Sequence, residues 1–244
     1  MTGTVVNMLL VIIGSAVGLF FRSRIRQSLM DAIVSVLGLA VLVIGISGAV
    51  KTEDLLCLII CLALGTFAGE CMEIEKRLDS AGDALQGIFK RFTGKGEGRF
   101  TEGFVSASIM YCVGSMAVMG SLEAGVNGNY TILISKGIID GVISVAFAAA
   151  MGVGVAFSAL SVGIYQGSLT LLAEWAAPYL SQKTVTGISA VGSVVIIGIA
   201  VNMLELGNKR LRVGNMLPAV FLPLVYLPLA DWFTNFLKTS ITFF

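Results

Sequence analysis

Charge-free stretches of membrane-spanning length constrain this chain more than any other feature of its sequence. Residues 33–50 and residues 142–161 contain no Asp, Glu, Lys or Arg. A helix needs about 20 predominantly apolar residues to cross the hydrocarbon core of a bilayer. Because 56% of the residues are hydrophobic and only 13% are charged, we predict an all-α, polytopic membrane helix bundle and not a water-soluble domain.

Eight apolar runs follow one another along the chain, which predicts about eight transmembrane helices. They lie at about 4–21, 31–50, 54–71, 103–120, 137–156, 159–177, 187–204 and 215–233. The fifth and sixth runs form one charge-free block, in which we expect a tight turn near Phe157 and Ser158. In the eighth run, Pro218, Pro223 and Pro228 predict a kinked or broken helix, since each proline removes a helix hydrogen bond.

The basic residues predict the orientation, because Lys and Arg near span ends stay on the cytoplasmic side. With eight spans, 12 of the 16 basic residues fall on one face. These are Arg22, Arg24, Arg26, Lys76, Arg77, Lys90, Arg91, Lys95, Arg99, Lys209, Arg210 and Arg212, whereas the opposite face holds Lys51, Lys136, Lys183 and Lys238. We therefore expect a protein of the bacterial cytoplasmic (inner) membrane with both termini outside.

The segment from Ile74 to Phe100 differs from the apolar runs. Its apolar residues recur at steps of three and four, and charged residues fill the other face, which predicts an amphipathic helix. We assign residues 73–102 as a cytoplasmic connector built on this helix. The helix lies either on the lipid headgroups or on the underside of the bundle.

An internal repeat divides the chain. Setting Asp31 against Asp140 aligns DAIVSVLGLAVLVIG with DGVISVAFAAAMGVG, and neighbouring spans match in the same order. This predicts a three-helix repeat in residues 1–72, a second and inverted copy in residues 103–180, and a C-terminal helix pair in residues 181–244. An inverted repeat is found in many secondary transporters, in which the two halves meet near the bilayer midplane. The other interpretation is that duplication only supplies a stable bundle.

Polar side chains recur at helical spacing in two of the spans. They are Ser108, Tyr111 and Ser115 in the fourth span, and Ser161, Tyr165, Gln166, Ser168 and Thr170 in the sixth. Ser161, Tyr165 and Ser168 share one stripe of the sixth span, while Gln166 and Thr170 share a neighbouring one. Such groups either join helices or line a path for a solute. Glycine pairs four residues apart, such as Gly14 with Gly18 and Gly137 with Gly141, indicate close helix packing.

Four acidic residues are candidates for binding an ion or a proton. Asp31 and Asp140 stand near the starts of the second and fifth spans, where each could cap a helix, and Asp140 could instead face an aqueous vestibule. Glu70 and Glu174 end the third and sixth spans, either at the mouths of a pathway or as solvated groups at the interface.

Several functions are excluded by composition. The chain has no histidine, which removes His-dependent nucleophiles, His-ligated zinc and His proton relays. We expect no enzyme activity, no catalytic set, no metal and no cofactor, and the net charge of +1 argues against nucleic acid.

We predict a secondary transporter or channel for a small polar or ionic solute, with membrane lipid as its surroundings. The alternative is a sensor or assembly protein that acts through the amphipathic segment. The sequence leaves the solute, and whether the chain forms a homo-oligomer, open.

Several long segments also carry a family resemblance. They include GECMEIEKRL, GFVSASIMYCVGSMAVMGSLEAG, KGIIDGVISVAFAA, YQGSLTLLA and RVGNMLPA, and together they span nearly the whole chain. In these segments the chain resembles the YqgA-like family of uncharacterised bacterial integral membrane proteins, a domain of unknown function. The resemblance implies a multi-spanning protein and assigns no substrate, cofactor or residue role.

Overall fold

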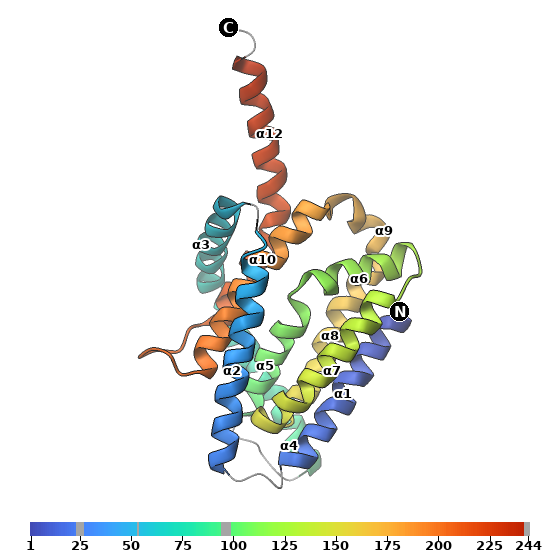
Figure 1. Ribbon diagram of the computed structural model, residues 1–244, viewed down its shortest axis with the longest axis vertical. Helices are drawn as coiled ribbons and strands as arrows, with labels where there is room; N and C mark the ends of the chain where they lie inside the picture. The colour runs from blue at the N-terminus through green and yellow to red at the C-terminus, as the bar shows by residue number, and fades with distance from the viewer. Residues whose placement is uncertain (23–26, 53, 94–98, 242–244) are drawn as a thin grey trace.

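The structure is a bundle of helices (Figure 1). This computed structural model describes residues 1–22, 27–52, 54–93 and 99–241, and every regular element in these ranges is helical. The longer helices are α1 (Thr2–Arg22), α2 (Gln27–Ala49), α3 (Leu55–Met72), α4 (Ile74–Thr93), α5 (Phe100–Cys112), α6 (Ser115–Val126), α7 (Thr131–Met151), α8 (Gly154–Leu171), α10 (Gln182–Met203) and α12 (Pro223–Ile241). The short ones are α9 (Ala173–Ala176), η1 (Ala177–Tyr179), η2 (Val213–Met216) and α11 (Leu217–Phe221). The predicted all-α bundle is confirmed.

Within these described ranges, six helices are long and apolar enough to cross a membrane, namely α1, α2, α3, α7, α8 and α10. Two bent helix pairs raise the number to eight if each pair is one span: α5 with α6, bent by 60°, and η2–α11 with α12, bent by 40°. The prediction of about eight spans agrees with this larger count. The predicted interruption of the last span is confirmed, since α12 begins after the bend at Pro223.

Two boundaries differ from the sequence prediction. The turn expected near Phe157 is wrong, because α7 ends at Met151 and α8 begins at Gly154. Gly152 adopts a φ of 92° at the end of α7, in a region of backbone conformation that favours glycine. The fourth apolar run is also not one continuous helix, since it breaks between Cys112 and Ser115.

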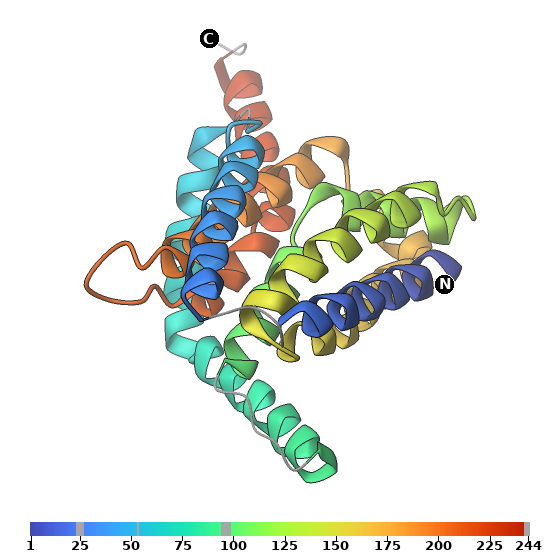
Figure 2. The ribbon, with the colours of Figure 1, turned by 60° about the horizontal axis from the view of Figure 1, so that its bottom comes forward.

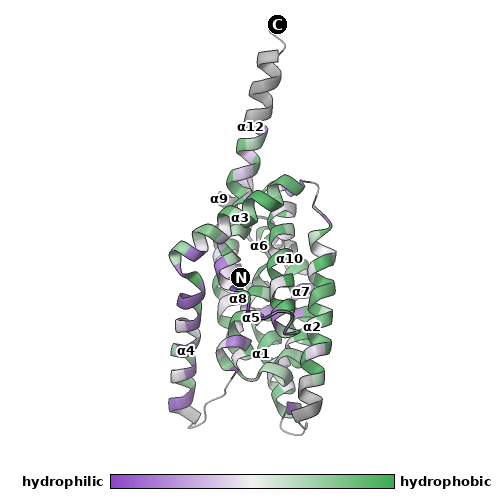
Figure 3. Ribbon diagram, turned by 90° about the vertical axis from the view of Figure 1, so that its left-hand side faces the viewer, coloured by the Kyte–Doolittle hydropathy of each residue, from purple (hydrophilic) through white to green (hydrophobic). Residues whose placement is uncertain are grey.

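The outward faces of the long helices are apolar. Exposed fractions between 58% and 74% are found for Ile13 on α1, Val36 on α2, Phe67 on α3, Val142 on α7 and Ile164 on α8. Figure 3 shows that hydrophobic residues dominate these helices, whereas many residues of α4 are hydrophilic. Water-soluble monomers rarely expose so much apolar surface, so these faces suit contact with lipid.

Glycines set how closely the helices pair. A Cβ added at Gly14 of α1 would lie 2.1 Å from the carbonyl oxygen of Gly141 in α7. Similarly, one added at Gly69 of α3 would lie 1.9 Å from the Asn215 carbonyl oxygen. Only glycine permits such contacts. The predicted close packing at these glycines is confirmed.

The same contacts give the helix directions. Gly18 of α1 meets Val145 of α7, and Gly137 of α7 meets Asn7, so α1 and α7 run parallel. In Figure 1, α2 runs in the opposite sense to both. Opposite senses for α2 and α7 are what an inverted pair requires. The repeat itself stays a prediction, because α1 packs mainly on α7 and α8 while α2 packs mainly on α10, so the first three helices do not form a separate unit.

The predicted amphipathic helix is confirmed as α4, which runs from Ile74 to Thr93. Its apolar side contacts the bundle, where the Phe89 ring centroid lies 6.2 Å from that of Phe100 and 5.9 Å from that of Phe157. Packing against the bundle was one of the two predicted locations. In Figure 2, α4 extends below the other helices, and its contacts with α5 and η2 hold it to the bundle.

Candidate functional site

A buried ion pair occupies the middle of α7. The Nζ of Lys136 donates to the Oδ2 of Asp140, and the two residues are only 7% and 5% exposed. α7 has 21 residues, which correspond to about 31 Å at about 1.5 Å per residue, so Asp140 lies near its midpoint. Charges at such a depth are costly unless each has a partner. The spacing of four residues along one helix face provides that partner.

Two amides connect this ion pair to neighbouring helices. The Nδ2 of Asn7 on α1 donates to the Oδ2 of Asp140 and to the Oε1 of Gln166 on α8, each at 3.2 Å. Both amides are fully buried. A Cβ at Gly137 would lie 3.0 Å from the Cα of Asn7, so this glycine lets α1 come close enough for Asn7 to reach the carboxylate.

A second polar contact ties the bent span to α7. The hydroxyls of Tyr111 on α5 and Ser144 on α7 lie 2.8 Å apart, and both residues are fully buried. Tyr111 precedes the break between α5 and α6, and Ser144 is one turn after Asp140. The bend is therefore held beside the ion pair.

A pocket of about 400 Å³ reaches the ion pair from the side of α2 and α10. Its polar lining consists of Ser47, Lys51, Lys136, Asp140, Ser189 and Ser193. Val113 and Gly114, at the break between α5 and α6, also line it, together with apolar side chains of α2, α5, α7 and α10. The arrangement combines a buried charge pair, an interrupted helix and space for a small molecule, as expected of ligand sites in membrane bundles.

The predicted polar residues of the sixth span separate into two environments. Gln166 and Thr170 are buried, and Gln166 faces α1. Ser161, Tyr165 and Ser168 instead line an apolar groove of about 390 Å³ between α5, α8 and α11, together with Ser108. In that groove the Ser108 hydroxyl donates to Ser161 at 2.9 Å.

Among the described side chains, Asp140 is the one acidic candidate that belongs to this site. Asp140 caps no helix, because Tyr130 is the N-cap of α7 and Asp140 lies mid-helix. Asp31 lies inside α2 and not before it, and its side chain, like that of Ser115, lies outside the described residues. Glu70 accepts a hydrogen bond of 2.9 Å from Arg212, and Glu174 is exposed on α9.

Three members of the site are not predicted by the sequence. The charge pattern places Lys136 on the face opposite to most basic residues, whereas it is buried within α7. Its spacing of four residues from Asp140 was the available signal, since opposite charges at this spacing meet on one helix face. Asn7 and Ser144 gave no such signal, because their partners are distant in the sequence.

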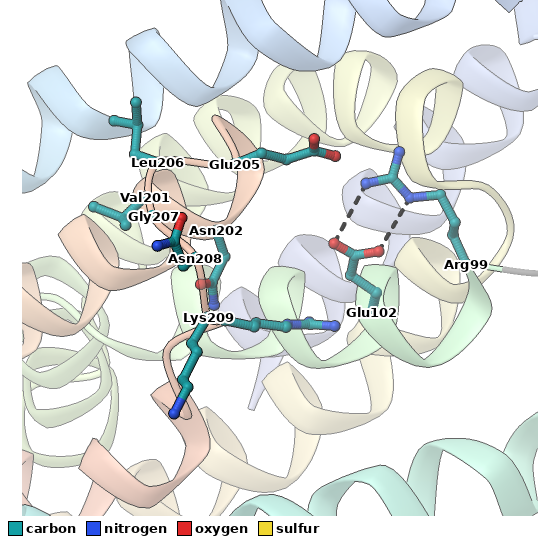
Figure 4. Close-up of a pocket in the computed structure, with 10 residues that line it drawn as sticks. Arg99, Glu102, Val201, Asn202, Glu205, Leu206, Gly207, Asn208 and Lys209 are labelled. Atoms are coloured by element: carbon teal, nitrogen blue, oxygen red, sulfur yellow. Dashed lines mark hydrogen bonds and ion pairs between the residues drawn. The ribbon is translucent and has the colours of Figure 1, made fainter.

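A different, polar pocket of about 430 Å³ lies between the start of α5 and the end of α10 (Figure 4). There the guanidinium of Arg99 donates to both oxygens of Glu102, at 3.0 and 3.3 Å. Glu205 and Lys209 also line the hollow. Its charges lie at the surface, where such pairs contribute little, and we assign it no part in the buried site.

The start of α4 is attached to the bent last span. The backbone N–H of Glu75 donates to the Oδ1 of Asn215 at 2.7 Å, and its carboxylate accepts from the N–H of Gly214. Burial raises the pKa of the Glu75 carboxyl, and the hydrogen bond from Gly214 opposes this rise. Among the described residues, no group of three or more His, Cys, Asp or Glu side chains is arranged to hold a metal ion.

The fold and the lipid-suited surface define a multi-pass α-helical membrane protein. The chain belongs to the family described as "Protein of unknown function (DUF554)", which it matches over residues 2–227. It is 27% identical over 231 residues to the uncharacterised membrane protein YdfK of Bacillus subtilis, covering 93% of this chain and 96% of YdfK. It is 28% identical over 221 residues to the uncharacterised protein YqgA of Escherichia coli, covering 90% and 93% of the two chains. No solved structure matches it.

Proposed function

We propose that this protein is a secondary transporter or channel that moves a small polar or ionic solute across the bacterial cytoplasmic membrane without ATP. The observation that carries the proposal is the pocket that reaches the buried Lys136–Asp140 pair beside the break between α5 and α6. Intramembrane charges are expensive and commonly mark substrate or ion pathways. A structural role alone would not require a pocket at the pair.

The pair can serve a solute by exchanging partners. An anionic group of the solute replaces Asp140 at the Lys136 ammonium, or a cationic group replaces Lys136 at the Asp140 carboxylate. Each exchange gives the charge of the solute a buried partner, so the solute does not enter the apolar interior unpaired. A displaced Asp140 carboxylate keeps its hydrogen bond from Asn7. The 60° bend between α5 and α6 provides an element that can change angle as the pair opens.

The proposed topology has both termini outside. It uses eight spans, counting each bent pair as one, and it places the basic residues of α4 and of the loop after α10 in the cytoplasm. An inverted relation between residues 1–72 and 103–180 would allow the site to open to either side.

Ligand-induced stabilisation of the purified protein tests this proposal. A ligand that binds only the folded state raises the melting temperature, so the protein is screened in detergent against inorganic ions, amino acids and nucleobases, and each hit is tested for flux in liposomes. The double variant Lys136→Met/Asp140→Asn removes both charges and should abolish the response. Ser168→Ala, in the apolar groove, is the matched control and should keep it. A hit that stabilises the double variant equally would contradict the proposed site.

A second candidate function is a sensor or assembly role through α4. The contacts of Glu75 with Gly214 and Asn215 favour it, because they connect α4 directly to the bent last span. Reversing the exposed charges Lys90 and Arg91 to glutamate separates the two functions. Solute flux should persist in that variant if the protein is a transporter, whereas a signalling partner would be lost.

A further inference from the structure

Besides Ser15 Oγ on α1, five buried polar atoms have no hydrogen-bond partner among the described residues. They are Thr4 Oγ1 and Asn7 Oδ1 on α1, Ser121 Oγ on α6, and Gln166 Nε2 and Thr170 Oγ1 on α8. None of these residues is more than 7% exposed. An unsatisfied buried polar group costs about 1–3 kcal/mol, so five such atoms together require an explanation.

The five residues lie toward one end of the bundle from the ion pair. α1 and α8 run antiparallel, because Gly163 contacts Met8 whereas Gly167 lies nearest Met1. Thr4 is therefore one turn from Asn7, and Thr170 one turn from Gln166, in the same direction.

Contacts of the neighbouring glycines place Ser121 at this end. Gly3 and Gly120 both contact Leu133, and Gly125 contacts the Thr170 carbonyl oxygen. The polar groups thus extend from Asp140 through the bonded amides of Asn7 and Gln166 toward Thr4, Ser121 and Thr170. We call these five residues the polar column.

The chemistry of the column fits water. Asn7 Oδ1 offers an acceptor, Gln166 Nε2 a donor, and the three hydroxyls offer both. A bare cation would be repelled by the Gln166 N–H, and an anion by the Asn7 oxygen. Buried water typically makes about three hydrogen bonds to polar groups that otherwise lack partners.

We propose that the polar column holds a file of water molecules that carries protons between the N-terminal face of the bundle and Asp140. A proton arriving along the file binds the Asp140 carboxylate, which becomes a neutral acid and releases Lys136 from its partner; the reverse step returns the proton to water. Only O–H bonds form and break, and no electron is transferred.

The titratable groups that interact with Asp140 are Lys136 on α7 and Tyr111 and Cys112 on α5. The assignment of protons as the coupling ion rests on the proposed transport function, whereas the hydration of the column does not.

Hydration is tested with single cysteines in a chain whose four native cysteines are replaced by alanine. Thr4→Cys and Thr170→Cys place thiols in the column, while Val11→Cys on α1 and Val162→Cys on α8 place them at fully buried apolar positions one turn beyond the two amides. Folding of each variant is checked by gel filtration. The probe is Ag⁺, added to intact cells from the side of the N-terminus. A thiol that has bound Ag⁺ is no longer labelled by maleimide after denaturation, so the loss of labelling measures the reaction. Thiols in the column should react at least about tenfold faster than the controls, because thiols buried in apolar surroundings are inert.

Proton delivery is read by infrared spectroscopy after a pH jump. The carboxylic acid band of Asp140, identified by its absence in Asp140→Asn, should form about tenfold more slowly in Thr170→Val, in which a hydroxyl of the file is missing.

Equal Ag⁺ rates at column and control positions would overturn the hydrated column. So would a block of the Ag⁺ reaction by Na⁺, because it would show that the column binds a metal cation and not water. Reactive column thiols without an Asp140 band would overturn the proton path. Neither readout needs the solute, so a protein without solute flux would refute the transport function and leave the column standing.

Discussion

Replacing Asp140 with asparagine should destabilise the protein strongly, because the substitution keeps the shape of the side chain and leaves the Lys136 ammonium without its charge partner. The two residues are 7% and 5% exposed, so bulk water does not solvate the ammonium that is left without its partner. Breaking a buried ion pair by removing one partner costs about 3–5 kcal/mol. In a chain of 244 residues, at about 2–4 °C per kcal/mol, the melting temperature should fall by about 6–20 °C.

The double variant Lys136→Met/Asp140→Asn separates this effect from a general loss of packing. Removing both charges leaves no unpaired ion, and replacing a whole buried pair is often neutral, so most of the lost stability should return. Both variants are measured by thermal unfolding of the purified protein in the same detergent. The reasoning is refuted if Asp140→Asn has the same melting temperature as the wild type, or if the double variant is no more stable than Asp140→Asn.

Two further predictions concern packing and pH. Gly14→Ala should lower the stability by about 1–3 kcal/mol through overpacking, since its Cβ would lie 2.1 Å from the Gly141 oxygen. Gly87→Ala is the control: a Cβ there meets nothing within 4 Å, so the variant should be neutral or more stable by up to about 1 kcal/mol. Equal melting temperatures of the two variants would contradict the close contact of α1 and α7. Because the pKa of Glu75 is raised above its ordinary 4.5 in the folded state, the folded protein binds this proton more tightly, so the group's contribution to stability should grow as pH falls toward 4.5 and shrink as pH rises. Glu75→Gln should flatten that part of the stability–pH profile, and an unchanged profile would argue against it.

The sequence was sufficient for the spans because lipid imposes length and apolarity on a helix whatever it packs against. It was insufficient for the turn between α7 and α8, where apolar composition continues through the turn and hides it. Gly152 was the usable signal there, because a glycine just after a helix commonly ends it. The prolines of the last span gave a stronger signal, and that interruption was predicted correctly.

The site was harder to predict because it depends on how each helix is rotated. Gln166 and Tyr165 are neighbours in sequence, yet one faces α1 and the other lines the groove beside α5. The close approach of α1 decides which side of α8 faces the bundle, and the local sequence of α8 carries no information about that contact. The Lys136–Asp140 pair is the exception, since its spacing on one helix could have been read from the chain alone.

The depth of the ion pair in the bilayer is the central claim, and a spin label measures it directly. Val142 lies two residues after Asp140, is 68% exposed and does not line the pocket, so Val142→Cys in a chain without native cysteines carries the label toward lipid, and Lys51→Cys, before α3, serves as the surface reference. We predict that the label at residue 142 is accessible to oxygen and protected from a water-soluble nickel reagent, as expected near the bilayer centre. Nickel accessibility equal to that of residue 51 would place the pair at the membrane surface and contradict the account.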